Sequence, residues 1–123
     1  VISSLLRQKI DLALAIEPEN EPQLEFKPLF TDELRFVVDA MHPWARAGRV
    51  AREEIARQNY ILYRKNTVTF RLIERYFLEE KIVLNTVMEL GTMEGIKELV
   101  KLGLGVSILA PWIARRELRE GSL

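Results

Sequence analysis

The feature that most constrains the fold is a regular alternation of helical and extended patterns in the second half of the chain. From residue 52 onward, hydrophobic periodicity gives the order helix, strand, helix, strand, helix, strand, helix. This order is typical of an α/β sheet whose strands are joined by right-handed helical crossovers. The sequence therefore predicts the α/β class, and its 123 residues are enough for a compact domain.

The individual segments carry distinct signatures. The predicted strands cover 60–63, 83–90 and 105–109. The first two predicted helices are 52–58, with Ile55 and Ala56 facing inward, and a helix that has Phe70, Ile73 and Phe77 on one face. A third helix packs Met93, Ile96, Leu99 and Val100, and a fourth begins at Pro111. Gly103 suits the left-handed position that ends the helix before it.

The first half is less regular. Residues 10–16 are apolar almost throughout, which predicts a strand buried on both faces. Residues 24–30 alternate between apolar and polar side chains, and residues 34–38 predict another strand. Residues 42–48, which contain Pro43, are interpreted as a loop.

Composition excludes several classes of function. Lys and Arg total 18, and Asp and Glu also total 18, so the formal net charge is zero and this chain is not expected to hold nucleic acid by itself. Cysteine is absent and His42 is the only histidine, which excludes disulfides, cysteine-ligated metals and multi-histidine sites. No apolar run approaches the roughly 20 residues of a membrane span. We therefore predict no cofactor, no metal and no membrane contact.

Candidate catalytic groups are few. His42 stands in a proline-containing segment, and we interpret it as part of a surface turn rather than as an acid or base. The Glu53–Glu54 and Glu79–Glu80 pairs are adjacent residues on helices, so their side chains diverge and belong to solvated faces. No catalytic residue is predicted.

The turns that follow two predicted strands are better candidates for binding. Residues 64–69 follow one strand and open a helix, and residues 91–93 do the same one unit later. Ligands in open α/β sheets lie at the carboxyl ends of the strands. Free N–H groups at the helix start, two hydroxyls and the two cations Arg64 and Lys65 would suit a carboxylate or a phosphate. The alternative is that Thr67 or Thr69 only caps the helix and that the cations are solvated.

Four stretches together resemble the effector-binding domain of LysR-type transcriptional regulators. They are LLRQKIDLAL at 5–14, LFTDELRFVV followed by HPWA at 29–45, LGTMEGIKELV at 90–100 and GLGVSILAP at 103–111. The resemblance covers nearly the whole chain. It implies the periplasmic-binding-protein type II fold, in which two Rossmann-like α/β lobes are joined by two crossing strands.

The resemblance also implies a domain organisation. Residues 1–30 and 107–123 would belong to lobe one and residues 34–105 to lobe two, with the crossovers near 31–36 and 105–109. The domain is expected to be truncated at both ends, and the N-terminal helix-turn-helix of the family is absent from this sequence.

The implied function is the sensing of a small, anionic metabolite by a cytoplasmic, non-enzymatic regulator. Promoter DNA would be bound only through the missing helix-turn-helix, and the full-length protein is expected to be a homo-oligomer, either a dimer or a tetramer. The expected effector-binding residues are Arg64, Thr67, Val68, Thr69 and Thr92. The alternatives are a periplasmic solute-binding protein of the same fold and an enzyme built on it.

Overall fold

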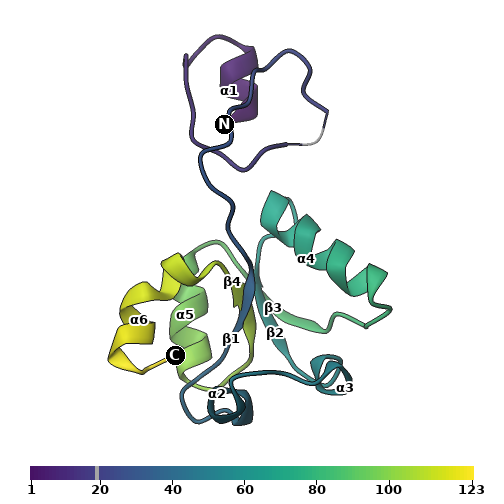
Figure 1. Ribbon diagram of the computed structural model, residues 1–123, viewed down its shortest axis with the longest axis vertical. Coiled ribbons are helices and arrows are strands. Elements are labelled where there is room, and N and C mark those ends of the chain that lie inside the picture. Colours follow the sequence, from purple (N-terminus) through teal and green to yellow (C-terminus); the bar gives the residue numbers. More distant parts are fainter. Residues whose placement is uncertain (19) are drawn as a thin grey trace. The chain divides into compact units, whose positions relative to one another are not determined.

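The computed structural model describes residues 1–18 and 20–123, which divide into two compact units (Figure 1). The first unit is Val1–Thr31 and the second is Asp32–Leu123. Among the described residues, no helix has the length and apolar character needed to cross a bilayer.

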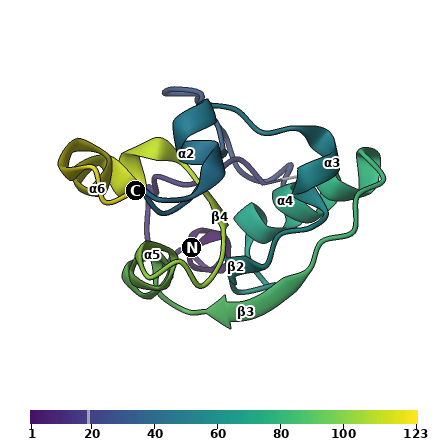
Figure 2. The same ribbon diagram turned by 90° about the horizontal axis from the view of Figure 1, so that it is seen from below.

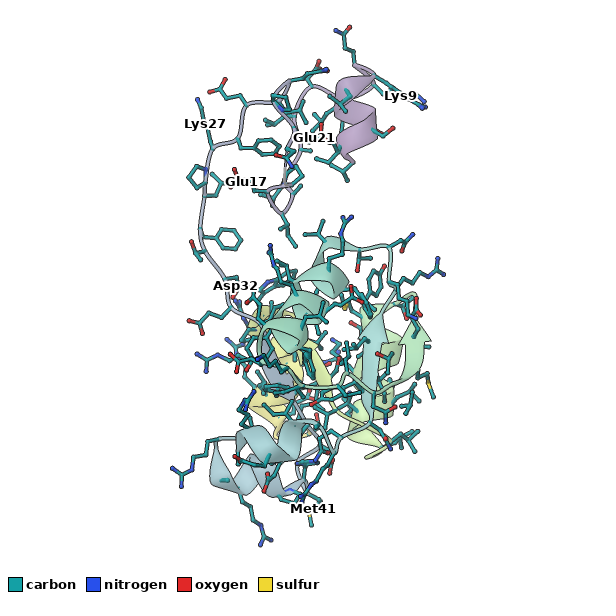
Figure 3. The ribbon with its side chains drawn as sticks, turned by 90° about the vertical axis from the view of Figure 1, so that its right-hand side faces the viewer. Lys9, Glu17, Glu21, Lys27, Asp32 and Met41 are labelled. Carbon is teal, nitrogen blue, oxygen red and sulfur yellow. The ribbon has the colours of Figure 1, made fainter. Side chains whose placement is uncertain are left out.

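The first unit contains one helix, α1 (Ile2–Leu6), and its described residues form no strand. The buried strand predicted over 10–16 is therefore wrong: Leu12 is 89% exposed and Leu14 is 74% exposed. A strand buried on both faces needs paired neighbours and a packed layer on each side, and the described part of this unit supplies neither. The alternation over 24–30 forms no strand for the same reason. Lys9 and Lys27 extend into solvent from this unit (Figure 3).

The second unit follows the predicted alternation. Its elements are β1 (Arg35–Val37), α2 (Pro43–Ala47), α3 (Arg52–Ile55), β2 (Tyr60–Tyr63), α4 (Val68–Glu79), β3 (Thr86–Leu90), α5 (Met93–Lys101), β4 (Ser107–Leu109), the 3₁₀ helix η1 (Pro111–Ala114) and α6 (Arg115–Glu120). The order from residue 52 and the α/β class are confirmed. Gly103 has the predicted left-handed backbone, with φ of 74°.

Several predicted boundaries are too wide. The helix predicted over 52–58 ends at Ile55, and Ala56 is exposed rather than inward. The strand predicted over 83–90 begins only at Thr86, because Thr86 pairs with Tyr60, the first residue of β2. The strands predicted over 34–38 and 105–109 shorten to the three residues of β1 and of β4. A strand extends only as far as a partner offers hydrogen bonds.

The loop predicted over 42–48 is also wrong, because it contains the short helix α2. His42 is its N-cap, and its Nδ1 accepts a hydrogen bond from the Trp44 N–H at 3.1 Å. Pro43 occupies the first helical position, and Gly48 ends the helix with φ of 67°. Met41, just before the cap, is 83% exposed (Figure 3). A histidine N-cap followed by proline at the first helical position is the signal that the loop interpretation overlooked.

The strands form two paired sets joined through β2. β2 runs parallel to β3, and β1 runs antiparallel to β4. An isolated parallel bridge between Tyr60 and Val106 joins the sets, and the Ile61 N–H donates to the Val106 carbonyl at 2.9 Å. β2 therefore lies between β3 and the residues that lead into β4, and Figure 2 shows β3 along the outer edge with β2 beside it.

Alternate residues of β2 face two separate cores. Tyr60 and Leu62 pack on the side of α4, whereas Ile61 packs on the side of α5. Figure 1 shows α4 and α5 on opposite sides of the strands. The α4-side cluster comprises Trp44, Ile55, Tyr60, Leu62, Phe70, Ile73, Phe77, Val106 and Ile108, and the α5-side cluster comprises Val37, Ile61, Ile96, Val100 and Leu109. The two helical faces expected from periodicity are thus the buried ones.

Candidate functional site

The carboxyl ends of β2 and β3 lie side by side. Tyr63, the last residue of β2, is in register with Leu90, the last residue of β3, and the two strands are parallel. The turn over 64–67 leads from β2 into α4, and the turn over 91–92 leads from β3 into α5. Two strand-to-helix turns are therefore adjacent at one edge of the sheet, which is where open α/β sheets bind ligands.

Each turn is closed by a threonine cap. The Thr67 Oγ1 accepts a hydrogen bond from the Phe70 N–H at 3.2 Å, and its hydroxyl donates to the Arg64 carbonyl at 2.7 Å. The Thr92 Oγ1 accepts from the Gly95 N–H at 3.1 Å. These caps begin α4 and α5, and each satisfies one of the free N–H groups of the first turn.

Two further contacts join the turn after β2 to the end of β3 and to the turn that follows β3. The Lys65 N–H donates to the Glu89 Oε1 at 2.8 Å, so the end of β3 fixes the turn that follows β2. The Arg64 side chain lies against Gly91: a Cβ placed on Gly91 would be 2.6 Å from the Arg64 Nη2. The Arg64 guanidinium therefore lies over the turn that opens α5, although the two residues are 27 positions apart in the sequence (91 − 64).

The sequence-predicted site residues fall into two groups. Arg64 and Thr92 are exposed, whereas Thr67, Val68 and Thr69 are half-buried. The structure brings Arg64 to the Gly91–Thr92 turn. The capping alternative holds for Thr67, whose hydroxyl is used by the helix, but Thr69 is not the cap of α4.

The sequence reasoning missed Glu89, and it placed Gly91 in a candidate turn without predicting the contact of Arg64 with that glycine. Glu89 acts through the Lys65 backbone, and Gly91 acts through the space that it leaves for Arg64. Both depend on the register between β2 and β3, which the sequence does not display. The glycine directly after a predicted strand was the available signal for Gly91, since glycine often marks a close approach.

The electrostatics of this edge favour an anionic group. α4 and α5 both direct their positive ends toward the turns, and Arg64 and Lys65 add two exposed positive charges. One carboxylate, that of Glu89, also lies here and is engaged by the Lys65 N–H. Within the described residues, no group of three or more His, Asp or Glu side chains could hold a metal ion. The arrangement offers donors for charge-assisted hydrogen bonds, which are the contacts that carboxylates and phosphates accept.

The family assignment rests on the whole chain. The family model of the LysR substrate binding domain matches residues 1–123. The chain belongs to the LysR substrate-binding domain family. Its fold is accordingly the type II periplasmic-binding-protein-like α/β fold, as expected from the four sequence stretches.

Several LysR-family proteins are similar to this chain. The malolactic fermentation system transcriptional activator of Lactococcus lactis is 30% identical over 112 residues, which cover 89% of this chain and 38% of that protein. A probable RuBisCO transcriptional regulator of Cyanidioschyzon merolae is 29% identical over 121 residues, covering 94% of this chain and 40% of that protein. The chain thus spans about two fifths of the length of these relatives. Because they are transcriptional regulators, the expectation of a regulator's domain is confirmed at the level of the LysR family.

Two solved LysR domains resemble the fold. The effector binding domain of QuiR in complex with shikimate has 31% sequence identity and a TM-score of 0.79, over 89% of this chain and 52% of that chain. The regulatory domain of CcmR from Synechocystis PCC6803, in complex with 2-PG, has a TM-score of 0.81 over the same shares, at 23% identity. Because its sequence identity is only 23%, the similarity to the CcmR domain supports the fold alone.

Proposed function

We propose that this chain is the ligand-sensing part of a LysR-type transcriptional regulator and that it binds a small anionic metabolite where β2 and β3 end. The observation that carries the proposal is the position of the Arg64 guanidinium over the Gly91–Thr92 turn. It places one positive charge beside both strand-to-helix turns. The shikimate bound by QuiR, which is 31% identical to this chain, is a small hydroxylated carboxylate and is the first probe to test.

Each proposed contact residue has a role. Arg64 supplies charge-assisted hydrogen bonds, Thr69 supplies a hydroxyl outside the α4 cap, and Val68 contributes its half-buried backbone and side chain. Thr67 and Thr92 hold the turns in shape and contact the ligand from their helix starts. A hydrogen bond to a charged group contributes about 1.5–3 kcal/mol, so two or three of them can support micromolar binding only in a preformed cleft.

The role in the whole protein extends the same proposal. We expect a helix-turn-helix elsewhere in the full-length regulator to bind promoter DNA, and a homo-oligomer, dimer or tetramer, whose geometry on DNA responds to the ligand. The regulator is proposed to be cytoplasmic and to have no enzymatic activity. Residues 1–30 and 107–123 would contribute to lobe one and residues 34–105 to lobe two. The first hundred codons of the natural gene separate this proposal from the periplasmic alternative, because a signal peptide would favour a solute-binding protein.

Calorimetry on the full-length protein tests the site. Shikimate, malate and benzoate are the probes, and we expect at least one to bind with a micromolar Kd. Arg64→Ala and Thr69→Ala should each weaken that binding about tenfold and reduce the effector response, with basal promoter binding unchanged. Arg57→Ala is the matched control, since Arg57 is an exposed arginine just before β2, at the opposite end from Arg64. Failure of all three carboxylates to bind, or full response by both variants, would reject the proposed site.

A further inference from the structure

Gly91 is a glycine that its own backbone does not require. It is not among the glycines with positive φ, which are Gly48, Gly103 and Gly121. A side chain at position 91 would therefore not force the backbone into a conformation that other residues avoid. The reason for glycine at this position has to come from what surrounds it.

The space beside Gly91 is taken by Arg64. The three atoms nearest to a Cβ placed there are all from the Arg64 side chain: Nη2 at 2.6 Å, Nε at 2.9 Å and Cζ at 3.0 Å. Ordinary contacts between such atoms begin at about 3.5 Å, so a methyl group and the guanidinium cannot both occupy these positions. Because the guanidinium ends a flexible side chain, the arginine would move and the backbone would stay.

We infer that Gly91 is a specificity-determining residue of the effector site: it keeps open the place where the Arg64 guanidinium lies over the α5 turn, and so selects for an anionic ligand. This inference rests on the proposed function, since it assigns the preference for a carboxylate to Arg64 in this position. Any larger residue at position 91 turns Arg64 away from the turn. The edge keeps the Lys65 charge and the positive ends of α4 and α5 but loses the contribution of Arg64, so its preference for an anion over a neutral analogue falls, while the Thr67 and Thr92 caps remain.

The test compares Gly91→Ala, Arg64→Ala and the double variant in the full-length protein. A crystal structure of Gly91→Ala should show the Arg64 guanidinium displaced by about 1 Å or more. Calorimetry with shikimate and its neutral methyl ester measures the preference, and Gly91→Ala should lower the shikimate-to-ester affinity ratio about tenfold. The double variant should bind like Arg64→Ala alone, because Gly91 acts only through Arg64. The melting temperature of Gly91→Ala should match that of the parent, because only the end of the Arg64 side chain has to move.

The outcomes separate this inference from the proposed function. An unmoved Arg64 in Gly91→Ala, or losses of affinity that add fully in the double variant, would overturn the role of Gly91. Loss of shikimate binding in Arg64→Ala without any loss in Gly91→Ala would overturn the inference and leave the proposed site in place. Unchanged carboxylate binding in Arg64→Ala would reject both.

Discussion

Lys97 of α5 and Glu117 of α6 form a buried ion pair. The Lys97 Nζ lies 3.0 Å from the Glu117 Oε1, and the two side chains are 6% and 1% exposed. The same ammonium lies 2.8 Å from the Glu94 Oε1 and donates to the Ile113 carbonyl at 3.1 Å. Lys97 thereby connects α5, which begins at the proposed effector site, to the η1–α6 segment, and the Lys101 Nζ adds a longer contact of 4.0 Å to the same Glu117 oxygen.

Removing one partner of this pair should destabilise the second unit. Lys97→Met leaves the buried Glu117 carboxylate with only the longer contacts from Arg116 at 3.7 Å and Lys101 at 4.0 Å. Glu117→Leu leaves the buried Lys97 ammonium paired only with the carboxylate of Glu94, which is 73% exposed. The double variant removes both buried charges and should recover much of the lost stability. We expect each single variant to lower the Tm by several degrees in thermal unfolding followed by circular dichroism. Glu120→Gln is the control, because its pair with Arg116 spans 3.9 Å and is exposed. Single variants as stable as the parent would show that the pair contributes nothing.

The same pair predicts how stability depends on pH. The backbone N–H of Glu117 and the Lys97 ammonium hold the pKa of the Glu117 carboxyl below its ordinary value. The contribution of the Glu117 carboxylate to stability is thus complete above the unfolded pKa of about 4.3. It is lost as the pH falls through the lower pKa of the folded state. Glu94 first, and then Glu117, raise the pKa of Lys97 against the effect of burial. The contribution of the Lys97 ammonium to stability is therefore complete below the unfolded pKa of about 10.4 and is lost as the pH rises through the higher pKa of the folded state. Urea unfolding across the acid range should show a shallower decline for Glu117→Gln than for the parent.

A second glycine provides a contrast with Gly91. A Cβ on Gly105 would lie 2.7 Å from the Asn59 carbonyl oxygen and 2.9 Å from the Ile61 Cγ1. The Asn59 carbonyl accepts a hydrogen bond from the Val106 N–H at 2.8 Å, so it cannot move aside as the end of an arginine side chain can. Gly105→Ala should therefore lower the free energy of unfolding by about 1–3 kcal/mol in urea titration, whereas Gly91→Ala leaves it unchanged. Equal stabilities of the two variants would contradict this distinction.

Tyr60 combines complete burial with one hydrogen bond. Its ring is 0% exposed, its hydroxyl donates to the Ile55 carbonyl at 2.7 Å, and burial raises its pKa far above the ordinary value. Tyr60→Phe keeps the ring but removes the short hydrogen bond to that carbonyl, which retains only the longer one from the Gln58 N–H at 3.4 Å. We therefore expect a loss of about 1–3 kcal/mol in the free energy of unfolding in urea. Tyr76→Phe, on a 44% exposed residue, should cost much less. A similar loss in both variants would argue against the role of the hydrogen bond.

Periodicity was sufficient to predict the second unit, because there the chain supplies its own partners. Phe70, Ile73 and Phe77 bury their shared face on β2, and the order of elements from residue 52 is as predicted. Residues 10–16 have the pattern of a buried strand but no strand beside them among the described residues of the first unit, so Leu12 stays exposed. The hydrophobic pattern of a segment predicts which face it can bury, but it does not say whether a strand or helix is present to pack against that face.

The candidate site was predictable only in part. A strand followed by Arg64 and two threonines predicts a strand-to-helix turn and its cap, and both are present. The contact of Arg64 with Gly91 depends on the pairing of Tyr63 with Leu90, which is a relation between distant segments. Sequence spacing cannot supply that register, because the two strands are joined by a whole helix.

The threonines of the turns allow capping to be separated from ligand binding. Thr67 and Thr92 each accept a hydrogen bond from the first turn of a helix, so Thr67→Ala and Thr92→Ala should each lower the free energy of unfolding by about 1 kcal/mol. Thr69 does not cap α4, so Thr69→Ala should leave unfolding in urea nearly unchanged while it weakens carboxylate binding. Thr67→Ser is the control, because serine keeps the capping oxygen and should keep the stability. If Thr69→Ala lowered stability as much as Thr67→Ala and left binding intact, Thr69 would be a structural residue and the ligand contacts would have to lie elsewhere on this edge.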